Sequence, residues 1–371
     1  MIKRSVAAAL TAFTLMGTAA TTASAAPHHV TYKITTRIER TVHVDAAPNG
    51  RPTGAAQDGI FCAKPVIVTN ELIRTRSCTI NLMRLDVFKM VDGVPELVGN
   101  ASFNVQQETN LNIRSLSWSE KISMTKATVE GEAAGITVDF SAVAPGVKAA
   151  VTGDLAKPFE LGAAAPAGTI NYTMPLTKGQ QNTTHTNYNL LYTKAGYLPG
   201  DTAWGSETYR CDNGIANNGK GCVYPKHTPT DDGVLPSAML FLPRISQNIR
   251  NVQRAPLHIG RPGSSIPLER ADAATQKDNR RDVCSGKPGP GDINWIVIPP
   301  VPPQKFNATT PTCDEYPFAS TYQGGVRYAP PNRAIKWVPK WENDLQGNIL
   351  LDFYRQNRIL IGDPYYINMG V

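Results

Sequence analysis

The stretch Cys313-Asp314-Glu315-Tyr316-Pro317-Phe318-Ala319-Ser320 places two adjacent carboxylates behind a cysteine, and its proline prevents a helix from continuing through them. Tyr316, Phe318 and the small Ala319 are typical of a segment that packs against a core. Adjacent acidic residues are usually solvated surface charges, but carboxylates in a packed segment need hydrogen-bond partners or a metal ion. This segment is therefore the first candidate for a functional site.

The residues after the acidic pair predict strands, a helix and a final strand. Strands are expected at 326–329 and 334–338, and a last one at 358–367. Between them, Glu342-Asn343-Asp344 opens a helix, because acidic and amide side chains suit a helix N-terminus. One apolar stripe at helical spacing is expected to face the core. It consists of Leu345, Ile349 and Phe353.

A β-β-α unit of this kind would direct Asp314, Glu315 and Asn343 towards one point. Such oxygen ligands suit a hard divalent cation, for example Mg²⁺, which keeps several waters and takes few protein ligands. Phosphodiester hydrolysis uses a metal ion in this way, together with a protein base that activates water. Basic residues in this region could hold a phosphate backbone, and four of them, Arg280, Arg281, Arg327 and Arg355, are the expected phosphate-binding residues. The other basic residues nearby are Arg270, Arg333, Lys336 and Lys340.

The first half of the chain, residues 30–200, predicts antiparallel β-structure. Apolar and polar residues alternate over 32–44, which is the period of a half-buried strand. Further alternations at 116–124, 136–140 and 170–174 are separated by turn-rich stretches. Short strands with this punctuation favour an antiparallel β-sandwich. No catalytic pattern is visible here, so a binding or spacer role is expected.

Residues 1–26 have the features of a signal peptide. Lys3 and Arg4 provide a basic start, residues 6–16 form a short apolar run, and Ala23-Ser24-Ala25 is a small-residue cleavage pattern. The apolar run is too short to span a bilayer, which takes about 20 residues. We therefore expect an exported protein that is not held in a membrane.

Six cysteines occur in the chain. An oxidising destination favours disulfides over thiolate chemistry, and six cysteines allow about 15 pairings. Pairing between neighbours in sequence is the simplest expectation. A zinc site is disfavoured, because the usual Cys and His ligand spacings are missing. The expected pairs are Cys62 with Cys78, Cys211 with Cys222, and Cys284 with Cys313.

The length of 371 residues suggests two domains. We expect a β-rich accessory domain over 27–200 and a second domain over 201–371, which gives an α+β chain. The formal net charge of +7 is compatible with a polyanionic partner but does not identify one.

Several separated motifs resemble the NucA/NucB-type deoxyribonuclease domain of secreted bacterial proteins, particularly the actinobacterial type. The resemblance covers roughly residues 205–371 and is specific because the motifs occur in the right order. They are Cys-Asp-Glu-Tyr-Pro-Phe-Ala-Ser-Thr at 313–321, Glu-Asn-Asp-Leu-Gln-Gly at 342–347, Phe-Tyr-Arg-Gln-Asn-Arg-Ile-Leu at 353–360 and Gly-Asp-Pro-Tyr-Tyr at 362–366.

The resemblance implies a small α+β domain with a ββα-metal core and DNA cleavage that depends on Mg²⁺ or Mn²⁺. It implies that Glu315 is the general base, that Asn343 holds the metal, and that Asp314 is a ligand or orients the base. Thr312 and Cys313 depart from the family pattern, which has Asp and Arg there, so the roles of the two acids remain interchangeable. Burial or a neighbouring like charge, for which Asp314 is the obvious source, would have to raise the pKa of Glu315.

The sequence therefore favours a secreted endonuclease that acts on DNA with little sequence preference, with RNA as an open second substrate and a monomer assumed. A second hypothesis is a non-catalytic extracellular protein that binds DNA or cell wall through a degenerate nuclease domain. A glycan hydrolase is less favoured. Its two carboxylates lie about 5–9.5 Å apart across a sugar, which adjacent residues rarely provide.

Overall fold

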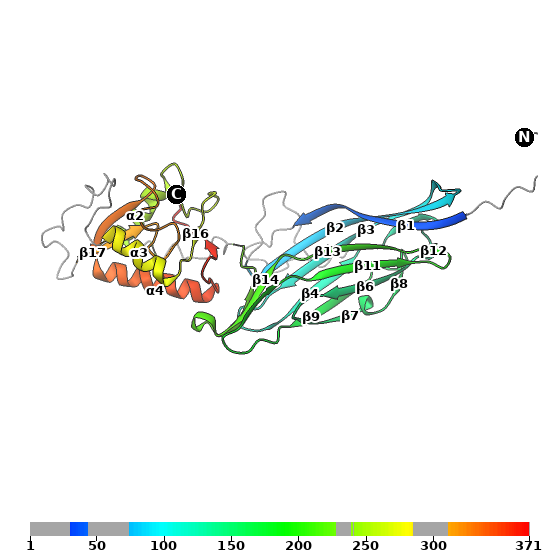
Figure 1. Cartoon of the computed structure of the whole chain (residues 1–371), viewed down its shortest axis with the longest axis horizontal. Helices are drawn as coiled ribbons and strands as arrows, with labels where there is room; N and C mark the ends of the chain where they lie inside the picture. The colour runs from blue at the N-terminus through cyan, green and yellow to red at the C-terminus, as the bar shows by residue number, and fades with distance from the viewer. Residues whose placement is uncertain (1–29, 44–73, 228–238, 240, 285–310, 371) are drawn as a thin grey trace, which may run out of the picture.

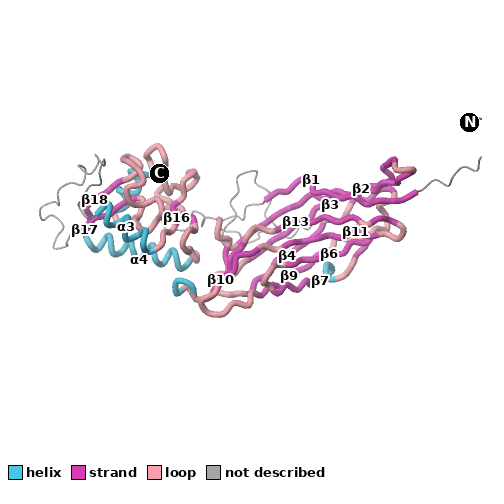
Figure 2. Tube along the Cα trace, in the orientation of Figure 1, coloured by secondary structure: helices cyan, strands magenta, loops and turns pink. Residues whose placement is uncertain are grey.

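The protein is described by a computed structural model that covers residues 30–43, 74–227, 239, 241–284 and 311–370. The expected signal peptide (1–26) and Cys62 lie outside these residues. In the described part, no helix has the length and apolar character needed to cross a membrane. The chain forms a large strand-rich lobe and a smaller C-terminal lobe that contains the long helices (Figures 1 and 2).

The strand-rich lobe contains fifteen strands and two short 3-10 helices within the ranges that the structure describes. They are β1 (Val30–His43), β2 (Arg76–Val91), β3 (Val94–Asn110), β4 (Ser117–Met124), β5 (Thr128–Gly131), β6 (Thr137–Val143), β7 (Lys148–Gly153), η1 (Asp154–Ala156), β8 (Phe159–Glu160), β9 (Ala167–Thr173), β10 (Gln181–Thr184), β11 (Asn187–Thr193), β12 (Tyr197–Leu198), β13 (Gly200–Gly205), β14 (Tyr209–Asn213), η2 (Ile215–Asn217) and β15 (Lys220–Val223).

These strands form three sheets. The largest has eight strands in the order β12-β1-β2-β3-β4-β9-β7, with β5 paired to β3. It is curled, and its pairs are antiparallel except for β1 with β12 (Figure 1). A four-stranded sheet has the order β13-β11-β6-β8, and a three-stranded sheet the order β10-β14-β15. The prediction of an antiparallel, strand-rich N-terminal half is confirmed.

One apolar cluster contains residues of both larger sheets. Leu85 and Ile122 come from the eight-stranded sheet, and Val138 and Leu190 come from the four-stranded one; all four are fully buried. The alternations read from the sequence at 116–124, 136–140 and 170–174 correspond to β4, β6 and β9. The period of two thus places every second side chain in the shared core.

The expected division at residue 200 falls inside this first core. Tyr209, Cys211, Cys222 and Tyr224 all belong to the first cluster, whereas the second cluster begins at Met239. The hairpin of β14 and β15, closed by the disulfide between Cys211 and Cys222, therefore packs with the strand-rich lobe. The predicted pairing of these two cysteines is confirmed. Cys78 is also disulfide-bonded, but its expected partner lies outside the described residues.

In the described residues of the C-terminal lobe there are three helices and two small two-stranded sheets, β16 with β19 and β17 with β18. Ile245 of the first helix, Tyr316 of a strand and Phe353 of the last helix meet in its apolar core. The elements are α2 (Pro243–Gln253), β16 (Leu268–Glu269), α3 (Ala273–Cys284), β17 (Pro311–Tyr316), β18 (Ala334–Pro339), α4 (Lys340–Gln356) and β19 (Pro364–Tyr365).

Three expectations for this lobe were wrong in detail. Residues 326–329 form turns and bends, and within 358–367 only β19 is a strand. Leu345 is 42% exposed, because the buried face of α4 runs through Glu342 and Gln346 to Leu350. Two polar residues take this inward face because they have polar surroundings there, and spacing alone does not reveal those surroundings.

Buried ion pairs join the two lobes. β14 lies at the end of the strand-rich lobe that is nearest to the C-terminal lobe (Figure 1). Arg74 and Arg210 both bond to the carboxylate of Asp363, with a distance of 2.7 Å from Arg210 Nη1 to Asp363 Oδ1. Arg358 pairs with Asp212 in the opposite sense, and its side chain is 1% exposed. The lobes therefore contact each other through charges that water does not reach.

Candidate functional site

The acidic pair lies in a strand-strand-helix unit. β17 pairs antiparallel with β18, so that Asp314 stands opposite Lys336 and Glu315 opposite Ile335. α4 follows β18 without a loop, and Asn343 therefore lies in its first turn. The acidic segment, one strand and the helix with Asn343 thus follow one another, without the strand expected at 326–329.

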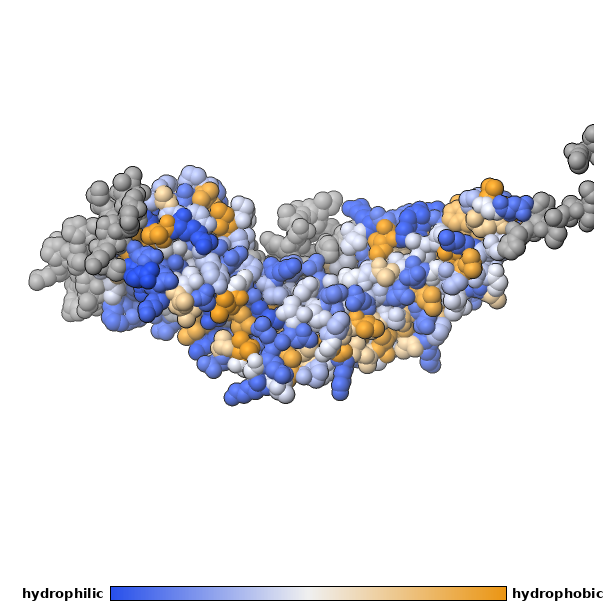
Figure 3. All heavy atoms as spheres, in the orientation of Figure 1, coloured by the Kyte–Doolittle hydropathy of each residue, from blue (hydrophilic) through white to orange (hydrophobic). Residues whose placement is uncertain are grey.

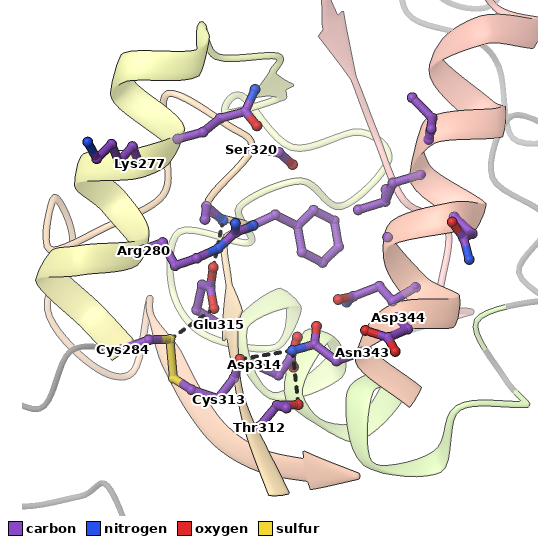
Figure 4. A pocket seen from close by; sticks show the side chains of 18 of the residues that line it. Lys277, Arg280, Cys284, Thr312, Cys313, Asp314, Glu315, Ser320, Asn343 and Asp344 are labelled. Carbon is purple, nitrogen blue, oxygen red and sulfur yellow. Dashed lines mark hydrogen bonds between the residues drawn. A yellow bond between two sulfur atoms is a disulfide. The ribbon is translucent and has the colours of Figure 1, made fainter. Parts of the chain in front are cut away.

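A disulfide attaches helix α3 to this unit. Cys284, the last residue of α3, is bonded to Cys313 of β17, as predicted from the sequence. The Cys284 sulfur lies 3.3 Å from Oε2 of Glu315 (Figure 4). Since a disulfide sulfur carries no proton, this is a packing contact. The disulfide therefore holds α3 directly beside the acidic residue.

Glu315 is buried, and this burial favours the protonated form of its carboxyl. The backbone N–H of Ala319 donates to its Oε1 at 3.2 Å, and only 9% of the residue is exposed. Burial raises the pKa of Glu315 to about 7, while the nearby charge of Arg280 acts in the opposite direction. Of the two expected causes, burial and the charge of Asp314, burial is the one that raises this pKa, through loss of hydration.

Asp314 lies in different surroundings, although it is the next residue. Adjacent residues of a strand project to opposite faces. Accordingly, Glu315 reaches Cys284 of α3, whereas Asp314 Oδ2 accepts a hydrogen bond of 2.8 Å from Asn248 Nδ2 of α2. Burial, and next the charge of Glu315, hold the pKa of Asp314 well above its usual range. The two acids are thus not directed at one point as expected.

Asn343 is fixed by the strand beside it. Its Nδ2 donates to Thr312 Oγ1 at 3.1 Å and to the backbone oxygen of Cys313 at 3.0 Å (Figure 4). Because the amide nitrogen is engaged in this way, the amide oxygen remains for a ligand. The hydroxyl of Thr312 therefore takes part in orienting the amide, although the sequence pattern has an acid at that position.

These residues line one cleft of about 1430 Å³ between α3, β17 and α4. Asp314, Glu315 and Asn343 contribute to its wall, and Lys277 and Arg280 of α3 line it as well. Of these two, Arg280 points towards Glu315 (Figure 4). Hydrophilic side chains cover much of the surface around α3 (Figure 3). The cleft thus combines buried carboxyl groups with a basic edge.

The expected phosphate-binding arginines separate into two groups. Arg280 lines the cleft and influences Glu315 electrostatically. Arg281 also lines it but is paired with Asp278 at 2.7 Å and with Asp282 at 2.8 Å. Arg327 and Arg355 do not line the cleft. Two of the four expected contacts are therefore placed away from the site.

Three further cleft residues were not among the expected site residues. Lys277 lies one helical turn before Arg280, so helical spacing would have found it. Gln346 lies three residues after Asn343 and is 5% exposed, and its Nε2 has no hydrogen-bond partner among the described residues. Arg270 was named from the sequence only as a nearby basic residue. Its guanidinium carbon lies 4.7 Å from the centre of the Tyr354 ring.

Glu342, expected only as the start of a helix, is fully buried and holds α2. Its carboxylate accepts from the backbone N–H of Arg244 at 3.1 Å and from the guanidinium of the same residue at 2.9 Å. A carboxylate at the first turn of another helix satisfies N–H groups that have no partner within that helix. It also lies close enough to raise the pKa of Asp314.

The oxygen donors of the cleft fit a hard cation better than zinc. Among the described residues, one cluster has the spacing of three metal ligands, Cys284, Cys313 and Glu315. Its two cysteines form a disulfide and are not thiolates. A carboxylate and an amide oxygen remain, and Mg²⁺ or Mn²⁺ is bound by few protein oxygens together with waters.

The comparisons with known proteins agree with this arrangement. Residues 259–368 match the model of the family described as Deoxyribonuclease NucA/NucB. No curated protein and no solved structure matched the chain. The chain carries a NucA/NucB-type nuclease domain, and the matched residues contain α3, β17, β18 and α4.

Proposed function

We propose that the protein is an exported, metal-dependent endonuclease that hydrolyses phosphodiester bonds of DNA with little sequence preference. The observation that carries the proposal is the buried carboxyl of Glu315, whose pKa is raised to about 7, in a cleft with a basic edge. The family match supports DNA as the substrate. RNA remains a second substrate to be tested.

In this mechanism Glu315, once ionised, accepts a proton from the water that attacks the phosphorus, and the phosphodiester bond to the leaving oxygen breaks. A divalent ion supplies charge stabilisation at the phosphate when it is bound. The amide oxygen of Asn343 and an oxygen of the acidic pair would hold that ion. Arg280 and Lys277 would position the neighbouring phosphates.

Asp314 is assigned a supporting role. Its carboxyl is buried, favours its protonated form and is oriented by Asn248. Binding of a cation would favour its ionised form, so it remains the alternative ligand beside Asn343. The roles of the two acids are therefore unequal, with Glu315 as base and Asp314 as ligand or orienting group.

Export is part of the same proposal. The disulfides Cys211–Cys222 and Cys284–Cys313 are consistent with an oxidising, extracellular location. Little sequence preference is expected because the basic edge of the cleft suits contacts with phosphates, which carry no base information.

The first experiment measures degradation of plasmid DNA and of RNA with Mg²⁺ or Mn²⁺, with EDTA, and after the metal is restored. We expect DNA cleavage that EDTA abolishes and metal restores. Glu315→Gln should lower kcat by about 10²-fold or more. Glu269→Gln, outside the cleft, is the matched control. Full activity of Glu315→Gln would exclude Glu315 as the base.

A second variant tests the metal site. Asn343→Ala should raise the metal concentration needed for half-maximal activity, because it removes one oxygen ligand. Asn357→Ala, at the end of α4, is the control. An unchanged metal requirement in Asn343→Ala would contradict the assignment of Asn343.

A further inference from the structure

A second cavity lies in the strand-rich lobe. It has a volume of about 220 Å³ and shares no lining residue with the cleft at Glu315. One wall comes from β1, β2, β3 and β4, and the other from β11 and from β13 with the two residues after it. The cavity is therefore formed between the eight-stranded and the four-stranded sheet.

The inner face of the large sheet changes character at this cavity. Further along the same strands the inward residues are apolar, as with Leu85 and Phe103, but here they are polar. Asn81, Gln107 and Glu120 line the cavity and are between 2% and 6% exposed. Burial of polar groups costs free energy unless they are hydrogen-bonded. Buried polar residues at this end of the core indicate a role other than packing.

These groups are held in fixed positions by one another. Glu120 accepts hydrogen bonds from the hydroxyls of Tyr172 at 2.7 Å and Tyr188 at 2.8 Å. Gln107 donates to the same carboxylate at 3.3 Å and accepts from the indole N–H of Trp204 at 2.8 Å. The polar wall is thus preorganised, which lowers the cost of ordering it around a ligand.

The lining offers no cationic group for a phosphate. Glu120 and Glu207 both line the cavity, and no lysine or arginine is among the described residues that do. Nucleic acid is therefore not the ligand that this lining favours. The carboxylate of Glu120 is already surrounded by donors of the protein, which leaves little of its charge for a cation.

Hydroxyl groups make up much of the remaining wall. Thr41, Ser77, Thr79, Thr109 and Ser206 all line the cavity. A hydroxyl both donates and accepts, so these groups match a ligand whose own polar atoms are hydroxyls. The volume is below the roughly 300–1,000 Å³ typical of pockets for drug-sized ligands, and so suits a single ring.

We propose that this cavity binds one neutral sugar residue, with the hydroxyl wall and Gln107 contacting its hydroxyls and Trp204 its apolar face. The strand-rich lobe then attaches the chain to a glycan, while the C-terminal lobe acts on a different polymer. The proposal is independent of the nuclease chemistry, because the two sites share no residue.

The test uses the purified full-length protein and methyl glycosides of glucose, galactose, mannose and N-acetylglucosamine. Binding is measured by saturation-transfer NMR and titration calorimetry. We expect at least one glycoside to bind. Thr79→Val, which removes one wall hydroxyl at nearly constant volume, should weaken it about three- to tenfold. Thr193→Val, on the exposed face of β11, is the matched control.

Glu120→Gln is the second variant, and it should also weaken binding because an amide cannot accept from all of the donors around it. Circular dichroism identifies any variant that fails to fold. Nuclease activity should be unchanged in both variants, so failure of one proposal does not affect the other. Two results would overturn the assignment. One is that no glycoside binds at millimolar concentration; the other is that ethanolamine, used as a small cationic probe, binds more tightly than the sugars.

Discussion

At the scale of single residues, the proposed activity depends on the protonation of Glu315. Its carboxyl is excluded from water by α3, β17 and the disulfide beside it, and this burial raises its pKa to about 7. A base with a pKa near the working pH combines a useful ionised fraction with a strong pull on a proton. The consequence is a dependence on pH that can be measured in two ways.

The first prediction concerns activity. Because the base must be ionised, kcat/KM should rise with pH through about 7 and level off above it. Arg280→Ala should move this rise to higher pH, since the charge of Arg280 lowers the pKa of Glu315. Asp352→Asn, on the exposed face of α4, should leave the profile unchanged. A flat profile between about pH 5 and about pH 8 would contradict the role of Glu315.

The second prediction concerns stability. The folded-state pKa of Glu315, about 7, lies above its ordinary value of 4.5, so the folded protein holds the proton more tightly. The stabilising contribution is fully present below about pH 4.5 and is lost as the pH rises through about 7. Glu315→Gln avoids this loss. Its free energy of unfolding should exceed that of the unchanged protein above pH 7, by on the order of 3 kcal/mol.

Denaturant titrations at acidic and at weakly alkaline pH measure this difference. An inactive variant whose stability advantage over the parent grows as the pH rises from about 4.5 to about 7 would be hard to explain by a purely structural role. Equal stability of the two proteins at every pH would instead mean that Glu315 is not desolvated.

At the scale of elements, the sequence predicts local patterns better than it predicts contacts between residues far apart in the chain. The alternation in β4, β6 and β9 is a property of a few neighbouring residues, so the sequence predicts it. The same parity places Glu120 with the buried Trp118 and Ile122, which indicates an inward carboxylate. The partners of that carboxylate cannot be read in this way. Tyr188 is 68 residues away, and no periodicity connects the two.

The candidate site shows the same limit. The acidic segment, the disulfide to Cys284 and the helix that carries Asn343 all follow from short motifs. The opposite orientation of Asp314 follows from strand alternation and could have been predicted. The exclusion of Arg327 and Arg355 from the cleft depends on how loops and helix faces pack.

The third prediction concerns the contact between α3 and β17. Replacing Cys284 and Cys313 with serine should lower stability by about 2–4 kcal/mol and should also reduce cleavage, because α3 carries the basic edge of the cleft. Replacing Cys211 and Cys222 removes a disulfide of the other lobe. It should cost stability while folded molecules keep their activity.

Cleavage per folded molecule, with the folded fraction measured by circular dichroism, separates the two effects. If both pairs of replacements lowered activity per folded molecule equally, the disulfide at the cleft would have no role beyond general stability.

At the scale of the whole molecule, the two lobes share a buried set of charges. Asp363 of the C-terminal lobe forms ion pairs with Arg74 and Arg210 of the strand-rich lobe. Arg358 of the C-terminal lobe forms an ion pair with Asp212 of the strand-rich lobe. Arg358 also donates to the backbone oxygen of Ile113 at 3.0 Å. Buried charges are tolerated when each has an oppositely charged partner. If one partner is lost, the remaining charge is buried without compensation.

The fourth prediction follows from this arrangement. Asp363→Ala should lower the free energy of unfolding by about 3–5 kcal/mol and should separate the melting of the lobes into two transitions. Asp352→Asn breaks an exposed pair with Arg355 and should cost less than about 1 kcal/mol. Differential scanning calorimetry measures both. A single unchanged transition in Asp363→Ala would show that the lobes do not depend on these charges.

The buried charges between the lobes also limit how the chain can be recombined. Arg358 and Asp363 lie inside the matched nuclease region, whereas Arg74, Arg210 and Asp212 lie outside it. If this region were transferred to another carrier protein, Asp363 and Arg358 would lose their ion-pair partners, which belong to the strand-rich lobe. Fusion designs would have to keep both halves of this electrostatic joint, or replace Arg358 and Asp363 together with residues suited to a solvent-exposed surface.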